Sequence, residues 1–127
     1  MSRKLTDHKL NGLNEAIEIE VMDSPGSGGA NHTYLVKLDG DDVDPMLQVR
    51  KTYIHFQNGP IGEAGFNGIS NEALLAILID RMRGFQSGPF ASRDNACALT
   101  HMEEALMWLQ KRTRDRMARG VEGTYQK

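Results

Sequence analysis

The spacing of the apolar residues changes once along the chain, near residue 70, and this change limits the folds the chain can adopt. Before residue 70, apolar and polar residues alternate over short segments, as in half-buried strands. After it come two long segments of helix-forming residues, separated by QSGP at 86–89. A block of strands followed by a block of helices predicts an α+β fold.

Three segments of the first half are predicted to be strands. Two stretches of turn-forming residues, SPGSGGAN and DGDDVDP, separate them. Because neighbouring strands are joined by short connections, we expect an antiparallel β-meander. The predicted strands are 16–23, 32–38 and 46–57, and the connections are 24–31 and 39–45.

The segment NGPIGEAGFNGIS, residues 58–70, is predicted to be a structured glycine-rich loop. Its glycines can adopt backbone angles that other residues avoid. Two roles stay open for residues 56–69: shaping a pocket or an oligomer contact, or only connecting the sheet to the first helix.

Two helices are predicted after this loop. Ser70 or Asn71 caps the first, which runs to Gly84 and is apolar around most of its circumference, so it is deeply buried or shared with a partner chain. The second begins near Phe90 or Ser92 and ends at Arg119, before Gly120. The full prediction is one domain, 1–127, with flexible ends at about 1–10 and 121–127, a sheet at 14–57, the loop at 58–70 and a helical hairpin at 71–119.

Composition indicates a soluble cytoplasmic protein. Of the 127 residues, 39% are hydrophobic and 25% charged, and the formal net charge is −2, which argues against a general nucleic-acid-binding protein. The single cysteine, Cys97, excludes an intrachain disulfide and favours a reducing compartment. No apolar stretch is long enough to predict a membrane span or a signal peptide.

A cluster of cations ends the second helix, in KRTRDRMARG at 111–120. Arg112 and Arg116 lie one turn apart, so their guanidinium groups project together and suit bidentate recognition of phosphate. The alternative is that cations near a helix C-terminus only interact with the macrodipole, by about 0.3–1 kcal/mol each. We assign Lys111 and Arg114 to that role, with Asp115 spaced to pair with Lys111.

Phe85, Phe90 and Asn95 surround the turn between the helices. A ring that stacks on a base and an amide that meets the base edge would complete a nucleotide site with the arginines. The alternative for the two phenylalanines is core packing in the hairpin. Asn95 and Arg112 are about 25 Å apart along one helix, so a shared site requires an antiparallel dimer in which Arg112 and Arg116 come from the partner subunit.

The sequence contains no recognisable catalytic set, so we expect no enzyme, no metal and no cofactor. The histidines, at positions 8, 32, 55 and 101, show no ligand spacing, and Cys97 lies among helical alanines. Two competing functions stay open. One is an enzyme that hydrolyses a cyclic nucleotide with Glu63, His55 or Glu104 as acid or base. The other is a nucleic-acid- or protein-interaction module that uses the basic helix end.

Residues 58–124 resemble the first-described family of phage Thoeris anti-defence proteins. The resemblance includes FQSGPF, the asparagine that follows it and RTRDR. Proteins of this family are sponges that sequester cyclic ADP-ribose isomers made by bacterial TIR-domain proteins. The resemblance implies an N-terminal antiparallel sheet, paired C-terminal helices and a ligand site in a homodimer. In some members it also implies hexamers that bind cyclic trinucleotides at separate sites.

Carried to this chain, the resemblance implies that Phe85 stacks on the base, Asn95 makes a polar contact, and Arg112 and Arg116 contact the phosphates. It predicts a protein that acts in the cytoplasm of the infected host. There it binds the signal without cleaving it and thereby blocks Thoeris immunity. Its partners are then a small cyclic nucleotide and a second copy of itself, with no membrane and no nucleic acid. The residues of a trinucleotide site are not placed by the resemblance.

Overall fold

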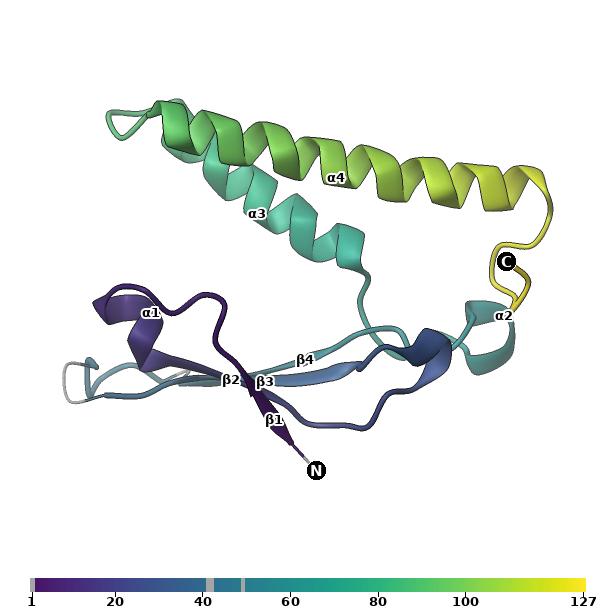
Figure 1. Ribbon diagram of the computed structural model, residues 1–127, viewed down its shortest axis with the longest axis horizontal. Coiled ribbons are helices and arrows are strands. Elements are labelled where there is room, and N and C mark those ends of the chain that lie inside the picture. The colour runs from purple at the N-terminus through teal and green to yellow at the C-terminus, as the bar shows by residue number, and fades with distance from the viewer. Residues whose placement is uncertain (1, 41–42, 49) are drawn as a thin grey trace. The chain divides into compact units, whose positions relative to one another are not determined.

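The structure is a computed structural model that describes residues 2–40, 43–48 and 50–127 (Figure 1). It divides into two compact units. The sheet unit comprises Met1–Gly59 and Ala64–Ile69, and the hairpin unit comprises Pro60–Glu63 and Ser70–Lys127. The α+β fold predicted from the sequence is confirmed, with an antiparallel meander followed by helices, the last of them long.

The sheet unit contains a four-stranded antiparallel sheet in which the strands follow one another in chain order. The strands are β1 Arg3–Leu5, β2 Ile17–Val21, β3 Thr33–Leu38 and β4 Lys51–His55. β1 lies in the segment predicted to be a flexible end. It pairs with β2, Arg3 opposite Val21 and Leu5 opposite Ile19, and its three residues are too few to show a period in the sequence.

Two further elements differ from the prediction. A short helix, α1 Gly12–Ala16, precedes β2 and is capped by the Asn11 side chain, which accepts the Asn14 N–H at 3.2 Å. The third predicted strand, 46–57, shortens to β4, and Met46 and Leu47 lie exposed in a turn. Residues 41–42 of the predicted turn and residue 49 of the predicted strand lie outside the described residues.

The two faces of the sheet differ in chemistry, as the alternation in β2 predicts. Val21 is buried with 1% of its surface exposed, on the face that Ile17 and Ile19 share. The opposite face carries ion pairs: Glu18 with Lys9 at 2.6 Å and Glu20 with Lys37 at 2.7 Å. The pKa of each of these glutamates is below its usual value, chiefly because each accepts a hydrogen bond from its lysine.

The glycine-rich segment 58–70 connects β4 to α3. It contains a single helical turn, α2 Ile61–Ala64. The Asn67 side chain closes this loop on Asn58. It accepts the Asn58 N–H at 2.7 Å and donates to the Asn58 carbonyl at 2.7 Å. The loop ends beside β4, where the Ile69 N–H donates to the His55 carbonyl at 2.8 Å.

The hairpin unit consists of α3 Asn71–Gln86 and α4 Arg93–Ala118. Both begin at a serine cap: Ser70 Oγ accepts the Ala73 N–H and Ser92 Oγ accepts the Asn95 N–H, each at 3.1 Å. Gly120, with φ of 72°, follows the end of α4. None of the helices in the described part of the chain has the length and apolar content that a membrane crossing requires.

α3 is buried on one side only. Ile79 is 3% exposed, whereas Ile77 is 57% exposed and Leu78 48% exposed. Deep burial of α3 within one chain, which is one of the two alternatives from the sequence, is therefore not observed. The other alternative, a surface shared with a partner chain, stays a prediction.

Candidate functional site

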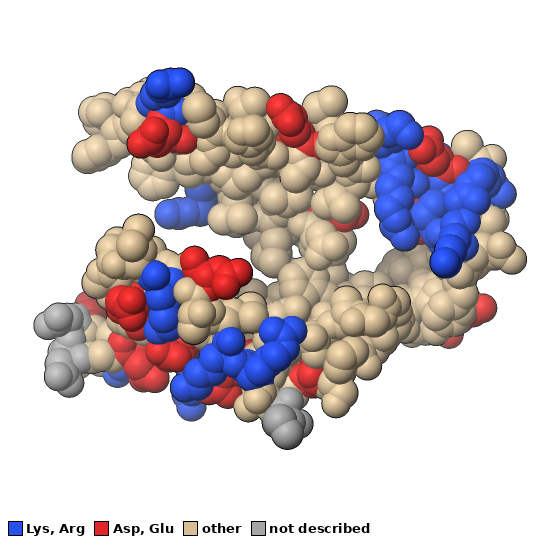
Figure 2. All heavy atoms as spheres, in the orientation of Figure 1, with Lys and Arg blue, Asp and Glu red and all other residues tan. Residues whose placement is uncertain are grey.

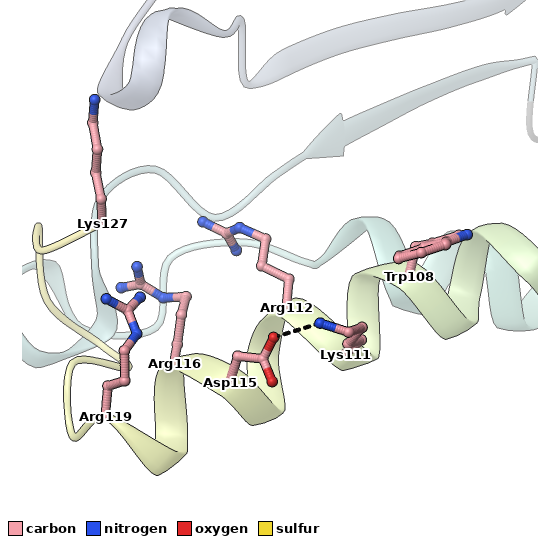
Figure 3. A pocket seen from close by; sticks show the side chains of 7 residues that line it. All are labelled: Trp108, Lys111, Arg112, Asp115, Arg116, Arg119 and Lys127. Atoms are coloured by element: carbon pink, nitrogen blue, oxygen red, sulfur yellow. Dashed lines mark hydrogen bonds and ion pairs between the residues drawn. The ribbon is translucent and has the colours of Figure 1, made fainter.

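Cationic side chains gather over the C-terminal end of α4, at the right of the view in Figure 2. They line a surface pocket of about 430 Å³, which we call the cationic pocket (Figure 3). Most of its residues lie three or four positions apart on α4 and so share one side of the helix. The lining residues are Trp108, Lys111, Arg112, Asp115, Arg116, Arg119 and Lys127.

Arg112 and Arg119 are the cations of this pocket best placed to bind an anion. Their side chains extend to the same side of α4 (Figure 3). Among the residues that the structure describes, neither guanidinium group has an ion-pair or hydrogen-bond partner. A guanidinium group presents a planar fork of N–H donors that matches two oxygens of a phosphate. This end of α4 can therefore take an anion without first breaking a contact at these two residues.

Lys111 contributes less net charge, because it is paired. Its Nζ lies 2.8 Å from Oδ2 of Asp115, and both side chains are exposed. The hydrogen bond from Lys111, helped by the charges of Arg114 and Arg119, lowers the pKa of Asp115. The pairing predicted from the spacing is confirmed.

Arg116 is held by carbonyls of segment 121–127. Its side chain is buried, with the residue 7% exposed. Its guanidinium group donates to the carbonyls of Val121 at 2.9 Å and Thr124 at 3.0 Å, and also to the Gln126 carbonyl. Nε lies 3.7 Å from the Glu122 carboxylate. Carbonyls of segment 121–127 thus surround this arginine, and the flexible end expected there stays a prediction.

Phe85 and Asn95 lie at the opposite end of the hairpin. Phe85, in the last turn of α3, is 42% exposed, and the Arg81 guanidinium carbon lies 5.6 Å from its ring centroid. Asn95 is half-buried in the first turn of α4. Phe90 is 75% exposed, so the alternative of core packing does not describe it in this chain.

The structure therefore brings together two of the four predicted site residues. Arg112 and Arg116 line the same pocket. Asn95 lies seventeen positions before Arg112 on α4, a separation of about 25 Å along the axis. A single site that contains all four residues needs a second chain, and that arrangement stays a prediction.

Trp108 is the lining residue that the sequence analysis missed. It is 69% exposed although it is a large aromatic side chain. It borders the cationic pocket and also a neighbouring pocket of about 470 Å³, together with Lys111. The signal that could have identified it is its position four residues before Arg112, which places the indole on the same side of the helix.

The candidate acid–base residues of the enzymatic alternative lie in different places. Glu104 borders the pocket next to Trp108, and Glu63 borders a pocket formed with residues 124–127. His55 belongs to β4 and stacks on Tyr53 with ring centroids 6.1 Å apart. Within the described residues, no three His, Cys, Asp or Glu side chains gather as a metal site would require.

Fold and site define a class: α+β proteins in which a helical hairpin follows an antiparallel sheet and presents a cationic pocket at the end of its longer helix. The chain belongs to the Acb2/Tad1 hairpin domain family, whose sequence model matches residues 49–114. It is also 54% identical, over 74 residues, to a protein of Bacillus phage SBSphiJ7 named Thoeris anti-defense 1. That alignment covers 58% of this chain and 52% of the relative, so the chain matches about half the length of the relative.

Proposed function

We propose that this protein is a Thoeris anti-defence protein that binds cyclic ADP-ribose isomers and withholds them, uncleaved, from the host's defence. The name of the relative and the family to which the chain belongs support the anti-defence role. The nature of the ligand is supported by the chemistry of the cationic pocket. The proposed place of action is the cytoplasm of the infected bacterial host.

The observation that carries the proposal is the pair of guanidinium groups of Arg112 and Arg119, which have no ion-pair or hydrogen-bond partner among the described residues and lie beside Trp108 in the cationic pocket. A cyclic ADP-ribose isomer carries two phosphates and one adenine. Two guanidinium forks suit the two phosphates, and an exposed aromatic face suits the apolar part of the ligand. A hydrogen bond to a charged group contributes about 1.5–3 kcal/mol.

The other half of the site comes from a second subunit in this proposal. Phe85 and Asn95 flank the turn of the hairpin, far along α4 from the arginines of the same chain. An antiparallel pairing of two α4 helices about a two-fold axis brings Phe85 and Asn95 of one protomer to Arg112 and Arg116 of the partner subunit, twice per dimer. The exposed Ile77 and Leu78 of α3 are available for such a contact.

Withholding a signal requires tight binding and no chemical step. A nanomolar dissociation constant corresponds to about 12 kcal/mol of binding free energy. We therefore propose that this protein is not an enzyme and uses no cofactor. Separate binding of cyclic trinucleotides and assembly into hexamers belong to the same proposal, without assigned residues.

The proposal predicts that Arg112→Ala weakens binding of a cyclic ADP-ribose isomer by a factor of about ten to one hundred, because one charged phosphate contact is lost. Isothermal titration with a panel of cyclic ADP-ribose isomers and cyclic trinucleotides measures this. Arg114→Ala is the matched control. It removes the same charge from the same helix, but Arg114 does not line the cationic pocket, so the affinity should stay within a factor of about three.

Three results would contradict the proposal. In the first, the nucleotide recovered after denaturation of the complex is cleaved, which favours the hydrolase. In the second, no isomer binds while DNA binds in a salt-sensitive manner, which favours the nucleic-acid-binding module. In the third, the mass of the assembly in solution is that of one chain, which removes the partner that supplies Phe85 and Asn95.

A further inference from the structure

Arg81 covers one face of the Phe85 ring. Its guanidinium carbon lies over the ring, 5.6 Å from the ring centroid. The two residues are four positions apart on α3, so their side chains lie one turn apart on the same side of the helix. A cation over an aromatic face is attracted by the negative charge of the π electrons. One face of this ring therefore has a partner within the same helix.

The rest of the Phe85 ring is open. Phe85 is 42% exposed, and Phe90, across the turn between the helices, is 75% exposed. Among the residues that the structure describes, neither ring is paired with another aromatic side chain. A flat aromatic group can stack on the face of Phe85 that the guanidinium group leaves uncovered.

A role in holding the hairpin together does not account for the position of Arg81. In the described part of the chain, its guanidinium group forms no ion pair and no hydrogen bond, and its contact is with the Phe85 ring. The nearby Arg83 differs in this respect, because it pairs with Glu103 at 2.7 Å and so links α3 to α4. The contact of Arg81 is therefore confined to α3 and acts on the phenylalanine alone.

This contact affects the freedom of the Phe85 side chain. An exposed side chain at the end of a helix loses rotamer freedom when it binds a ligand, and this loss weakens binding. A contact that already favours one rotamer reduces the loss, because less freedom remains to be removed. The cation on one face thus prepares the other face for stacking.

We propose that Arg81 is a positioning residue for base stacking. It favours one orientation of the Phe85 ring and leaves the opposite face for the adenine of the ligand. In the occupied site the ring lies between the guanidinium group and the base, and Arg81 acts without contacting the ligand. The identity of the base rests on the proposed function above, whereas the orientation of the ring does not depend on it.

The orientation of the ring is tested by NMR in the absence of nucleotide. The ring current of Phe85 shifts protons above its face upfield, so the side-chain protons of Arg81 should move downfield in Phe85→Leu. The three-bond couplings that report χ1 of Phe85 should indicate one rotamer in the parent and averaged rotamers in Arg81→Ala. Arg83→Ala is the matched control. It removes the same charge from the same helix and should leave these couplings unchanged. Unchanged couplings in Arg81→Ala would overturn the positioning role.

The effect on binding is tested by isothermal titration with a cyclic ADP-ribose isomer and with inorganic pyrophosphate, which has phosphates but no base. Arg81→Ala should weaken binding of the isomer about two- to fivefold, as expected for an exposed cation–π contact. It should leave the affinity for pyrophosphate unchanged. In a Phe85→Leu background, Arg81→Ala should cause no further loss, because the ring that it positions is absent.

Two binding results would overturn the proposal. An equal loss for both ligands, or in both backgrounds, would show that Arg81 acts through its charge alone. Tighter binding of the isomer in Arg81→Ala would show that the guanidinium group occupies the face that the base requires. If no isomer binds to the parent, the proposed function fails, and the NMR comparison still decides whether Arg81 positions the ring.

Discussion

At the scale of single residues, Gly68 shows how closely the glycine-rich loop approaches the sheet. A Cβ built at Gly68 would lie 2.4 Å from the carbonyl carbon of Phe56 and 2.6 Å from the carbonyl oxygen of His55. Both are backbone atoms, so they cannot move aside as a flexible side chain would. The requirement for glycine here comes from the space available to the backbone.

We predict that Gly68→Ala destabilises the sheet unit by about 1–3 kcal/mol, the usual cost of inserting a methyl group into a filled space. Urea unfolding measures the loss. Gly12→Ala is the control, because a Cβ at Gly12 meets nothing within 4 Å and should change the stability by no more than about 0.5 kcal/mol. Equal stability of the two variants would show that the loop does not lie this close to β4.

Residues of the site were predictable from the sequence to different degrees. Arg112 could be placed because its charge and helical spacing are both visible in the chain. The surroundings of Arg116 could not, because its partners are backbone carbonyls, which every residue carries. The exposure of Trp108 was also hidden, because an indole in a helix is as compatible with a core as with a pocket wall.

At the scale of elements, the side chain of Gln86 bridges the turn between α3 and α4. The Gln86 amide donates to the Ser92 carbonyl at 3.1 Å and accepts the Ser92 N–H at 3.0 Å. These reciprocal bonds join the end of α3 to the residue that caps α4. They therefore help to fix the positions of Phe85 and Asn95, which flank the turn.

We predict that Gln86→Ala costs about 1–2 kcal/mol of hairpin stability, because two hydrogen bonds are lost at about 0.5–1.5 kcal/mol each. Arg83→Ala removes a different link between the helices, the ion pair with Glu103 at 2.7 Å. That pair is exposed, so its loss should cost less than about 1 kcal/mol. Urea unfolding measures the stability of both variants. A larger loss of stability in Arg83→Ala than in Gln86→Ala would contradict the prediction.

Elements were predictable where a local signal marks them. The serines that cap α3 and α4, and the glycine after α4, are visible in the sequence, and the helices begin and end close to where these residues predict. β1 was missed because its stability comes from pairing with β2, a contact distant in sequence. α2 was missed because four residues among glycines carry no period.

At the scale of the whole molecule, the two units differ in their response to acid. Within the described residues, the carboxylates with a lowered pKa are Glu18, Glu20 and Asp23 in the sheet unit and Asp115 in the hairpin unit. At Asp23 burial raises the pKa, but hydrogen bonds, led by those from the N–H groups of His32 and Thr33 and helped by the Asn31 side chain, together outweigh it. A group whose pKa is lower in the folded state stabilises the fold above its unfolded pKa and loses that contribution as the pH falls.

We predict that lowering the pH through the usual glutamate value of 4.5 weakens the sheet unit more than the hairpin unit. Amide hydrogen exchange, compared between β3 and α4 at about pH 7 and about pH 3, measures the two units separately. Lys37→Met removes the partner of Glu20. At neutral pH the β3 amides of this variant should exchange faster than those of the parent. In acid the two exchange rates should become similar. A constant difference at both pH values would contradict the linkage.

The position of Trp108 has an optical consequence. The chain contains one tryptophan, and that indole forms a wall of the cationic pocket. All indole fluorescence of the protein therefore originates beside the pocket, from a ring that water reaches. Filling the pocket displaces that water, so the wavelength and intensity of the emission report whether the pocket is occupied. Binding can therefore be followed by intrinsic fluorescence, without a label.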